Sequence, residues 1–208
     1  MQPYRRDLTH LNELTSFSLN FRIGILTIPD SKLCPSITED EIVRENNRGC
    51  FTAFYPKWVE SAGAKVSPIF YNSTTQEIKE QLKSVNGVLF TGGGIEDPQF
   101  NTTYMRAARF IYEEAVAMHQ AGDHFPLWGT CQGFQVLMLL GSSEQGVLSY
   151  NAFDSEDMSL PLVYTADAKE SRLLNGVGER IASLLGSQNI TSNLHHDGVS
   201  KRNFDKFN

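Results

Sequence analysis

The sequence lacks several features that would place it at once in a broad functional class. It has three cysteines and no Cys-X-X-Cys pair, which argues against a structural zinc site or a disulfide framework. No stretch approaches the roughly 18 apolar residues that a bilayer-spanning helix needs. The first 20 residues are polar and contain no apolar segment, so we expect no signal peptide there and no membrane partner.

A basic surface stripe is missing as well. The formal net charge is -6 and the isoelectric point is about 5.4. The basic pairs Arg5-Arg6 and Lys201-Arg202 are short and far apart in the chain. Because binding to phosphates needs clustered Lys and Arg, we expect no nucleic-acid partner. The 208 residues, of which 40% are hydrophobic and 20% charged, suffice for one globular domain with a real core.

Short apolar runs alternate with helical patterns along the first two thirds of the chain. The runs predict strands over residues 21–28, 65–70, 86–91 and 125–130, and the patterns predict helices over 51–62, 74–85 and 102–121. Pro56 should kink or delay the first helix. This alternation predicts an α/β fold with a mainly parallel sheet. A polar lead-in, residues 1–20, precedes a single domain over residues 21–208. Beyond Gly141 the pattern loosens, with a fifth strand expected over 160–165 and a short helix over 176–186.

The stretch Gly129-Thr130-Cys131-Gln132-Gly133 has the form Gly-X-Cys-X-Gly between a predicted strand and a predicted helix. This is the cysteine counterpart of the Gly-X-Ser-X-Gly nucleophile elbow, whose glycines leave room for a sharp turn. The turn aims the positive end of the helix at Cys131, which stabilises a thiolate. The Gln132 N–H would then face the oxygen of an attacked carbonyl. The alternative is a buried structural cysteine beside a glycine turn.

A second loop, Thr91-Gly92-Gly93-Gly94, also follows a predicted strand. Parallel strands present their carboxyl ends at one edge of the sheet, so we expect this loop and the Cys131 turn to open side by side. Its backbone could donate a second N–H to an oxyanion. The alternative is a plain turn. A phosphate-binding loop is disfavoured, since no Lys-Ser/Thr pair or Gly-X-Gly-X-X-Gly spacing follows.

Together these stretches resemble a known family. The segments "RIGILT", "WVESAGAKVSPI", "SVNGVLFTGGG" and "DHFPLWGTCQGF" are similar to those of gamma-glutamyl hydrolases, which belong to the class I glutamine amidotransferase-like cysteine peptidases. Weaker similarity continues in "LPLVYTADAKESRLL" and "TSNLHHDGVSKRNF". The resemblance covers about residues 21 to 204 and implies a flavodoxin-like α/β fold.

The resemblance also implies a chemistry. Cys131 would attack a gamma-glutamyl amide, the N–H groups of Gln132 and of Gly93 or Gly94 would hold the oxyanion, and water would release the glutamyl-enzyme. Gln135 and His195 would belong to the substrate pocket. The implied substrate is a folate poly-gamma-glutamate; no cofactor or metal is expected, and a homodimer is left open. The implied location is extracellular, lysosomal or vacuolar. Three N-glycosylation sequons, at Asn72, Asn101 and Asn189, accord with it, although roughly two are expected by chance.

Two positions depart from the family pattern. The hydrolases usually carry Glu where this chain has Gln135, whereas ammonia-yielding amidotransferases usually carry Gln there. This substitution removes a charge that could pair with a substrate amino group. Thr91 stands where the family usually has Pro before the glycines.

A thiol nucleophile usually has a histidine base. The family supplies it from a Trp-His-Pro-Glu-like segment, which this sequence does not contain before its last residue, Asn208. The five histidines are His10, His119, His124, His195 and His196. His119 should face solvent, and Asp197 is poorly placed to orient its neighbour His196. We therefore expect the domain to lack its last strands and the 208-residue chain to be weakly active or inactive. Hydrolysis at ordinary enzyme rates that Cys131→Ser abolishes would contradict this.

Two other functions stay open. A glutaminase subunit that feeds ammonia to a synthetase is favoured by Gln135 and opposed by the "WVESAGAKV" segment and the sequons. A non-catalytic relative that binds glutamyl compounds or a protein partner is favoured by the absent His-Glu segment.

Overall fold

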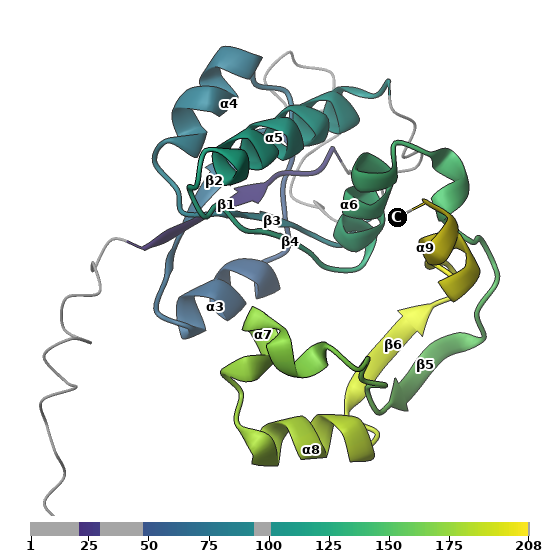
Figure 1. Ribbon diagram of the computed structural model, residues 1–208. Helices are drawn as coiled ribbons and strands as arrows, with labels where there is room; N and C mark the ends of the chain where they lie inside the picture. The colour runs from purple at the N-terminus through teal and green to yellow at the C-terminus, as the bar shows by residue number, and fades with distance from the viewer. Residues whose placement is uncertain (1–20, 30–47, 94–100, 208) are drawn as a thin grey trace, which may run out of the picture. The chain divides into compact units, whose positions relative to one another are not determined.

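The computed structural model describes residues 21–29, 48–93 and 101–207 and divides into two compact units (Figure 1). Unit 1 is Met1–Gln145 and unit 2 is Gly146–Asn208. The single domain expected over residues 21–208 stays a prediction.

A four-stranded parallel sheet forms the centre of unit 1. Its strands are β1 (Arg22–Leu26), β2 (Lys65–Ile69), β3 (Val88–Phe90) and β4 (Leu127–Gly129), in the order β2-β1-β3-β4. All three pairings are parallel. The α/β fold predicted from the sequence is therefore confirmed. Pro68 lies in β2, an edge strand of this sheet, where a missing N–H is tolerated.

Helices cover both faces of this sheet. Helix α3 (Phe54–Ser61) lies on one face, and α4 (Thr75–Leu82) and α5 (Thr103–Gln120) lie on the other (Figure 1). Helix α6 (Gln132–Ser142) follows β4 directly and contacts α5, β3 and β4. The chain alternates strand and helix from β1 to α6, as the sequence predicts.

Local signals set where these helices begin. Pro56 delays α3 and does not kink it: the helix starts at Phe54, which puts the proline in the first turn, where no N–H partner is needed. Thr74 caps α4 in a reciprocal arrangement, with its hydroxyl accepting from the Glu77 N–H and the Glu77 carboxylate accepting from the Thr74 N–H. The Thr102 hydroxyl caps α5 by accepting from the Met105 N–H at 3.2 Å.

The core of unit 1 lies between the sheet and its helices. The apolar stripe predicted on α5 faces it through Met105, Ala108, Ile111 and Ala115, all of them buried. The stripe predicted on α3 is only partly covered: Val59 is buried, but Phe54 is 79% exposed and Trp58 53% exposed. The sequence therefore predicted the helix α3 correctly but overestimated how much of its apolar stripe is buried.

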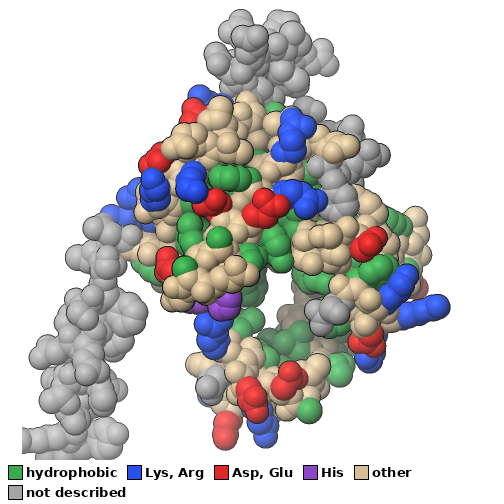
Figure 2. Space-filling model, turned by 45° about the horizontal axis from the view of Figure 1, so that its top comes forward, with side chains coloured by type: hydrophobic (Ala, Val, Ile, Leu, Met, Phe, Trp, Pro, Cys, Tyr) green, Lys and Arg blue, Asp and Glu red, His purple; other side chains and the backbone are tan. Residues whose placement is uncertain are grey.

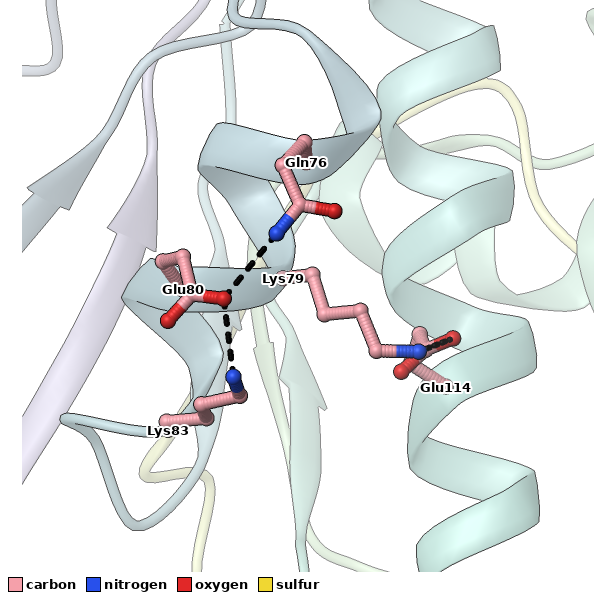
Figure 3. Close-up of polar contacts among 5 residues, drawn as sticks. All are labelled: Gln76, Lys79, Glu80, Lys83 and Glu114. Carbon is pink, nitrogen blue, oxygen red and sulfur yellow. Dashed lines mark hydrogen bonds and ion pairs between the residues drawn. The ribbon is translucent and has the colours of Figure 1, made fainter.

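A polar network covers the outer surface of α4 and α5 (Figure 3). Lys79 on α4 pairs with Glu114 on α5 at 3.2 Å. Within α4, the Glu80 carboxylate accepts from Gln76 at 3.0 Å and from Lys83 at 2.8 Å. Exposed pairs of this kind contribute about 0.2–1 kcal/mol each, so this network is a solvated helix surface and gives no sign of a site.

Unit 2 is built on two antiparallel strands, β5 (Ser155–Leu160) and β6 (Thr191–His195). A long connection joins them, and this strand pair is called the hairpin below. The helices α7 (Arg172–Asn175) and α8 (Glu179–Ser187) lie between these strands in sequence, and α9 (Lys201–Phe207) follows them. Single 3-10 turns lie at Gln145–Val147 (η1) and Ala168–Glu170 (η2). The register of the hairpin shifts between Ser155 and Met158, where Asp157 has a φ of 53°.

The sequence prediction for this unit was right about one helix and wrong about the strands. The helix expected over 176–186 is α8. The strand expected over 160–165 is wrong, because β5 ends at Leu160 and an irregular segment follows. Both β5 and β6 were missed, since SEDMSL and TSNLH carry few apolar residues and lie exposed or half-buried.

Charges on the surface are mixed. On the face shown in Figure 2, Lys and Arg side chains are interspersed with Asp and Glu rather than gathered into a stripe. Within the described residues, no helix combines the length and the apolar character that crossing a membrane requires.

Candidate active site

Cys131 stands at the corner between β4 and α6, as the residue that precedes the helix. Its φ of 58° and ψ of -121° are rare for a residue with a side chain and cost on the order of 1–3 kcal/mol. The turn is held by the Thr130 N–H, which donates to the Phe90 carbonyl at 3.1 Å, and by the Gly133 N–H, which donates to the Thr130 carbonyl at 2.9 Å. A strained residue at this position is what a nucleophile elbow requires.

Close packing explains the two glycines that flank the corner. A Cβ on Gly129 would lie 2.5 Å from the Gly133 carbonyl oxygen, and a Cβ on Gly133 would overlap the Phe90 carbonyl. Helix α6 can therefore approach β3 and β4 this closely only if both residues are glycine. The thiol of Cys131 is half-buried as a result of this packing.

The glycine loop after β3 opens beside Cys131. Phe90 pairs with Gly129 in the sheet, so the segments that follow the two strands leave from adjacent positions on one edge. A Cβ on Gly92 would lie 2.7 Å from the Cys131 Cβ and 3.0 Å from its Sγ. The expectation that the two loops open together is confirmed.

Tyr55 joins this pair from helix α3. Its hydroxyl oxygen accepts from the Gly92 N–H at 2.7 Å. The same hydroxyl would lie 2.7 Å from a Cβ on Gly92, so the phenol and the Cys131 thiol flank one point in space. Sequence reasoning placed Tyr55 only in an apolar stripe. The available signal was chemical: a tyrosine among apolar residues needs a partner for its hydroxyl.

The oxyanion donors predicted from the glycine loop, Gly93 or Gly94, lie only partly within the described residues. Gly92, whose N–H donates to Tyr55, was not among them, and Gly93 is the next residue. Gly94 lies outside the described residues. Gln132 is the first residue of α6, directly after Cys131, as expected of the second donor.

The environment of Tyr55 keeps its phenol protonated. Burial raises the pKa of Tyr55; the Gly92 N–H acts in the opposite direction, and the charge of a Cys131 thiolate adds to the rise. The oxygen accepts from the Gly92 N–H, and the phenol O–H is still able to donate a hydrogen bond.

Thr91 fills the position where the family pattern has Pro. It is 1% exposed, and among the described residues its Oγ1 has no hydrogen-bond partner. A buried hydroxyl without a partner costs about 1–3 kcal/mol, which proline would avoid. Nothing in the structure explains this substitution.

The other predicted site residues are placed as follows. Gln135 lies half-buried in the first turn of α6, with its N–H donating to the Cys131 carbonyl at 3.3 Å. His195 is the last residue of β6, in unit 2. The structure therefore brings together Cys131, Gln132, Gln135 and the glycine loop within unit 1.

Within the described part of unit 1, no histidine forms a hydrogen bond with the Cys131 thiol, so no contact there identifies the base. His119 is exposed on α5, as predicted, and His124 is exposed ahead of β4. The His196 ring is held by the Phe153 carbonyl and the Glu156 carboxylate, so Asp197 does not orient it. His10 lies outside the described residues.

The cysteines differ in state. Cys131 is a free thiol, whereas Cys50 is disulfide-bonded. Cys34 lies outside the described residues. Within the described ranges, no group of three His, Cys, Asp or Glu side chains could hold a metal ion. A half-buried free thiol at a helix N-terminus, beside a glycine loop, suits nucleophilic attack on a carbonyl.

Comparison with known proteins is consistent with this geometry. Residues 33–205 match the family model of Peptidase C26. The chain is 38% identical to the gamma-glutamyl hydrolase of Mus musculus over 152 residues, 73% of this chain and 46% of that protein. It is 37% identical to gamma-glutamyl hydrolase B of Dictyostelium discoideum over 153 residues, 74% and 43%. For the Homo sapiens gamma-glutamyl hydrolase the identity is 32% over 165 residues, 79% and 50%. The chain thus spans about half the length of the curated relatives it matches.

Proposed function

The chain belongs to the Peptidase C26 family, that of the gamma-glutamyl hydrolases, and from this premise we propose that it carries the acyl-transfer site of a cysteine-dependent gamma-glutamyl hydrolase. The proposed substrate class is the poly-gamma-glutamate tail of folates. The matched region covers about half of each of these relatives, so the activity of a whole hydrolase is a proposal for this chain.

The observation that carries the proposal is the convergence of Cys131, Gly92 and Tyr55 at one edge of the sheet. The thiol and the phenol both lie within 3.0 Å of the position that a Gly92 Cβ would occupy. Only glycine permits an approach this close, so the backbone of the glycine loop lies directly beside the sulfur, where the oxyanion of an attacked carbonyl would form. The elbow supplies the thiol at the N-terminus of α6, where negative charge is stabilised.

The proposed reaction has two steps. The Cys131 Sγ attacks the gamma-glutamyl carbonyl, and the N–H groups of Gln132 and Gly93 hold the oxyanion of the tetrahedral intermediate. The C–N bond breaks, the amine leaves with a proton, and a thioester joins Cys131 to the glutamyl group. Water then attacks this thioester and restores the thiol. Tyr55 holds the Gly92 peptide and, through it, the orientation of the neighbouring donor.

The acyl-enzyme gives the most direct test. The chain is mixed with a folate poly-gamma-glutamate, quenched in acid and examined by mass spectrometry for a glutamyl adduct on Cys131. Labelling by iodoacetamide near pH 6 measures the reactivity of the same thiol without the full reaction. We expect both signals in the native chain and neither in Cys131→Ser. An inert Cys131 that forms no adduct would contradict the proposal and favour a non-catalytic relative.

Two tyrosines provide a matched pair for the role of Tyr55. Tyr55→Phe removes the acceptor of the Gly92 N–H, and we expect the rate of adduct formation to fall about tenfold. Tyr71→Phe is the control, because burial raises the pKa of that tyrosine too, while none of the hydrogen bonds described for Tyr71 reaches the glycine loop. Equal rates for the two variants would show that the Tyr55 bond does not orient the loop.

A glutaminase subunit is the second candidate, and Gln135 is the observation that favours it. Its side chain lies in the first turn of α6, where the hydrolases usually carry a carboxylate. Release of ammonia from free glutamine at a rate above hydrolysis of gamma-glutamyl tails would decide for this function. Gln135→Glu should then raise hydrolysis and lower ammonia release.

We also propose that the protein works in an oxidising compartment, secreted or within a lysosome or vacuole. The disulfide at Cys50 supports this, since disulfides persist where thiols are not kept reduced. The sequon residues Asn72, Asn101 and Asn189 are all exposed on turns or irregular segments. A mass loss on treatment with an N-glycan-releasing enzyme, after expression in eukaryotic cells, would support this; a purely cytosolic, unglycosylated chain would contradict it.

A further inference from the structure

A histidine clamp joins the two strands of unit 2. His196 follows directly after β6, and its ring reaches across to the segment that leads into β5, which lies beside β6 in Figure 1. Its Nδ1 lies 2.9 Å from the Phe153 carbonyl oxygen, and its Nε2 lies 2.6 Å from the Glu156 carboxylate. Both ring nitrogens are therefore used at once.

Both partners of this ring are acceptors only. A carbonyl and a carboxylate each require an N–H, and a neutral imidazole has a single N–H. In the neutral form one nitrogen would therefore present a lone pair to an oxygen, and one of the two bonds would be lost. The geometry as it stands fits the doubly protonated imidazolium.

The charges around the ring act in the same direction. The Phe153 carbonyl raises the pKa of His196 most, the hydrogen bond to Glu156 raises it further, and the charges of Glu156 and Asp154 add to this. Partial desolvation of the ring acts in the opposite direction and lowers the pKa, but the net shift is upward. Asp197, the next residue, directs its Oδ1 to the Asn151 N–H at 2.7 Å.

The clamp sits where the backbone of the hairpin is irregular. The register slips between Ser155 and Met158, and the positive φ of Asp157 makes this segment strained. The His196 carbonyl accepts from the N–H groups of Ala152 and Phe153, each at 3.0 Å. The side chain and the carbonyl of one residue thus fix the start of β5 against the end of β6.

We propose that His196 is a proton-dependent clamp: its imidazolium fixes the irregular start of β5 to β6, and loss of one proton as the pH rises releases that attachment. The sign follows from the direction of the shift. A group with a raised folded-state pKa contributes stability that is complete below its ordinary value of 6.5 and is lost as the pH rises through the folded value. The hairpin is therefore firmer in acid.

The clamp bears on the candidate site through its neighbour. His195 is the preceding residue, and its carbonyl accepts from the Ser155 hydroxyl at 2.6 Å, so His195 and His196 hold the same end of β5. Any effect on substrate binding rests on the proposed function and on the family resemblance, which implies that His195 belongs to the substrate pocket. The clamp itself does not depend on that function.

The test follows the ring and the backbone separately from activity. In the whole chain, an NMR titration gives the pKa of His196. Amide hydrogen exchange gives the protection of Ala152 and Phe153 on either side of that pKa. We expect a His196 pKa above the ordinary value and protection that falls about threefold above it.

Four variants, one of them a control, separate the clamp from a structural role. Glu156→Gln should lower the His196 pKa, whereas Glu179→Gln, an exposed carboxylate change on α8 of the same unit, should leave it unchanged. His196→Gln should lose protection at acid pH, and His196→Lys should keep a cation near Glu156 and make protection independent of pH. The proposal is overturned if the His196 pKa is not raised, or if Glu156→Gln does not change that pKa. It is also overturned if the exchange protection of Ala152 and Phe153 does not change as His196 titrates. None of these outcomes bears on whether Cys131 forms an acyl-enzyme.

Discussion

The two units of this protein are held together in different ways. Unit 1 buries a continuous set of large side chains between its sheet and helices, among them Phe90, Ile111 and Leu139. In the described part of unit 2, only Val147 and Leu148 are buried. What unit 2 has instead is a dense set of hydrogen bonds from side chains to backbone, centred on Asn203, His196 and Ser155.

This difference has a physical consequence. A packed core responds to changes in volume, and its apolar side chains carry no charge that changes with pH. A hairpin fixed by exposed polar contacts responds to the loss of a single donor and to protonation. The candidate nucleophile lies in the first kind of structure, and the candidate pocket residue His195 lies in the second.

The largest expected effect comes from the elbow of unit 1. Gly133→Ala would place a Cβ against the Phe90 carbonyl of β3, where backbone cannot move aside. We expect a loss of about 3 kcal/mol or more in the stability of unit 1, measured by hydrogen exchange of the β3 and β4 amides. Gly176→Ala is the control, since nothing lies within 4 Å of its Cβ and its φ is -86°. A Gly133→Ala chain as stable as the native one would show that the elbow is loosely packed.

A smaller effect is expected when a leucine is shortened to alanine, and its size should differ between the two units. Leu139 on α6 is fully buried, and Leu194 on β6 is 64% exposed. We expect Leu139→Ala to cost about 2–5 kcal/mol and Leu194→Ala to stay within about 0.5 kcal/mol, in urea unfolding followed by hydrogen exchange. Comparable losses would mean that Leu194 is covered in solution, and the contrast between the units would fail.

The smallest expected effect concerns a single donor in unit 2. The Asn203 side-chain amide donates to the Gly146 and Val147 carbonyls and to the Ser149 hydroxyl, at 3.0–3.2 Å. Asn203→Ala leaves these acceptors without their donor, and we expect a loss of about 1–2 kcal/mol. Protection of the Ser149 amide should fall accordingly. Asn189→Ala, at an exposed bend of the same unit, should change the stability little. Equal losses for the two variants would show that the three hydrogen bonds of Asn203 do not stabilise unit 2.

The sequence predicted unit 1 far better than unit 2, for a physical reason. Strands such as β1 and β3 are buried on both faces, so a continuous run of apolar residues predicts them. The glycines around Cys131 predict a tight turn, which the packing of α6 requires. The contact between Tyr55 and Gly92 joins residues 37 positions apart, which no local pattern records. In unit 2, β5 and β6 are defined by pairing rather than by burial. Their polar sequence therefore carried no strand signal, and the apolar LPLVYT segment gave a false one.

The close approach of the two tryptophans has a practical consequence. Trp58 and Trp128 are the only tryptophans of the chain, and their ring centroids lie 6.0 Å apart in unit 1. The Trp128 indole donates to the Thr130 hydroxyl at 3.1 Å, one residue before Cys131. The intrinsic fluorescence of the protein is therefore an optical probe attached to the elbow itself. We expect this fluorescence to change when the Cys131 corner is acylated or disturbed, and unit 2 contributes no tryptophan to it.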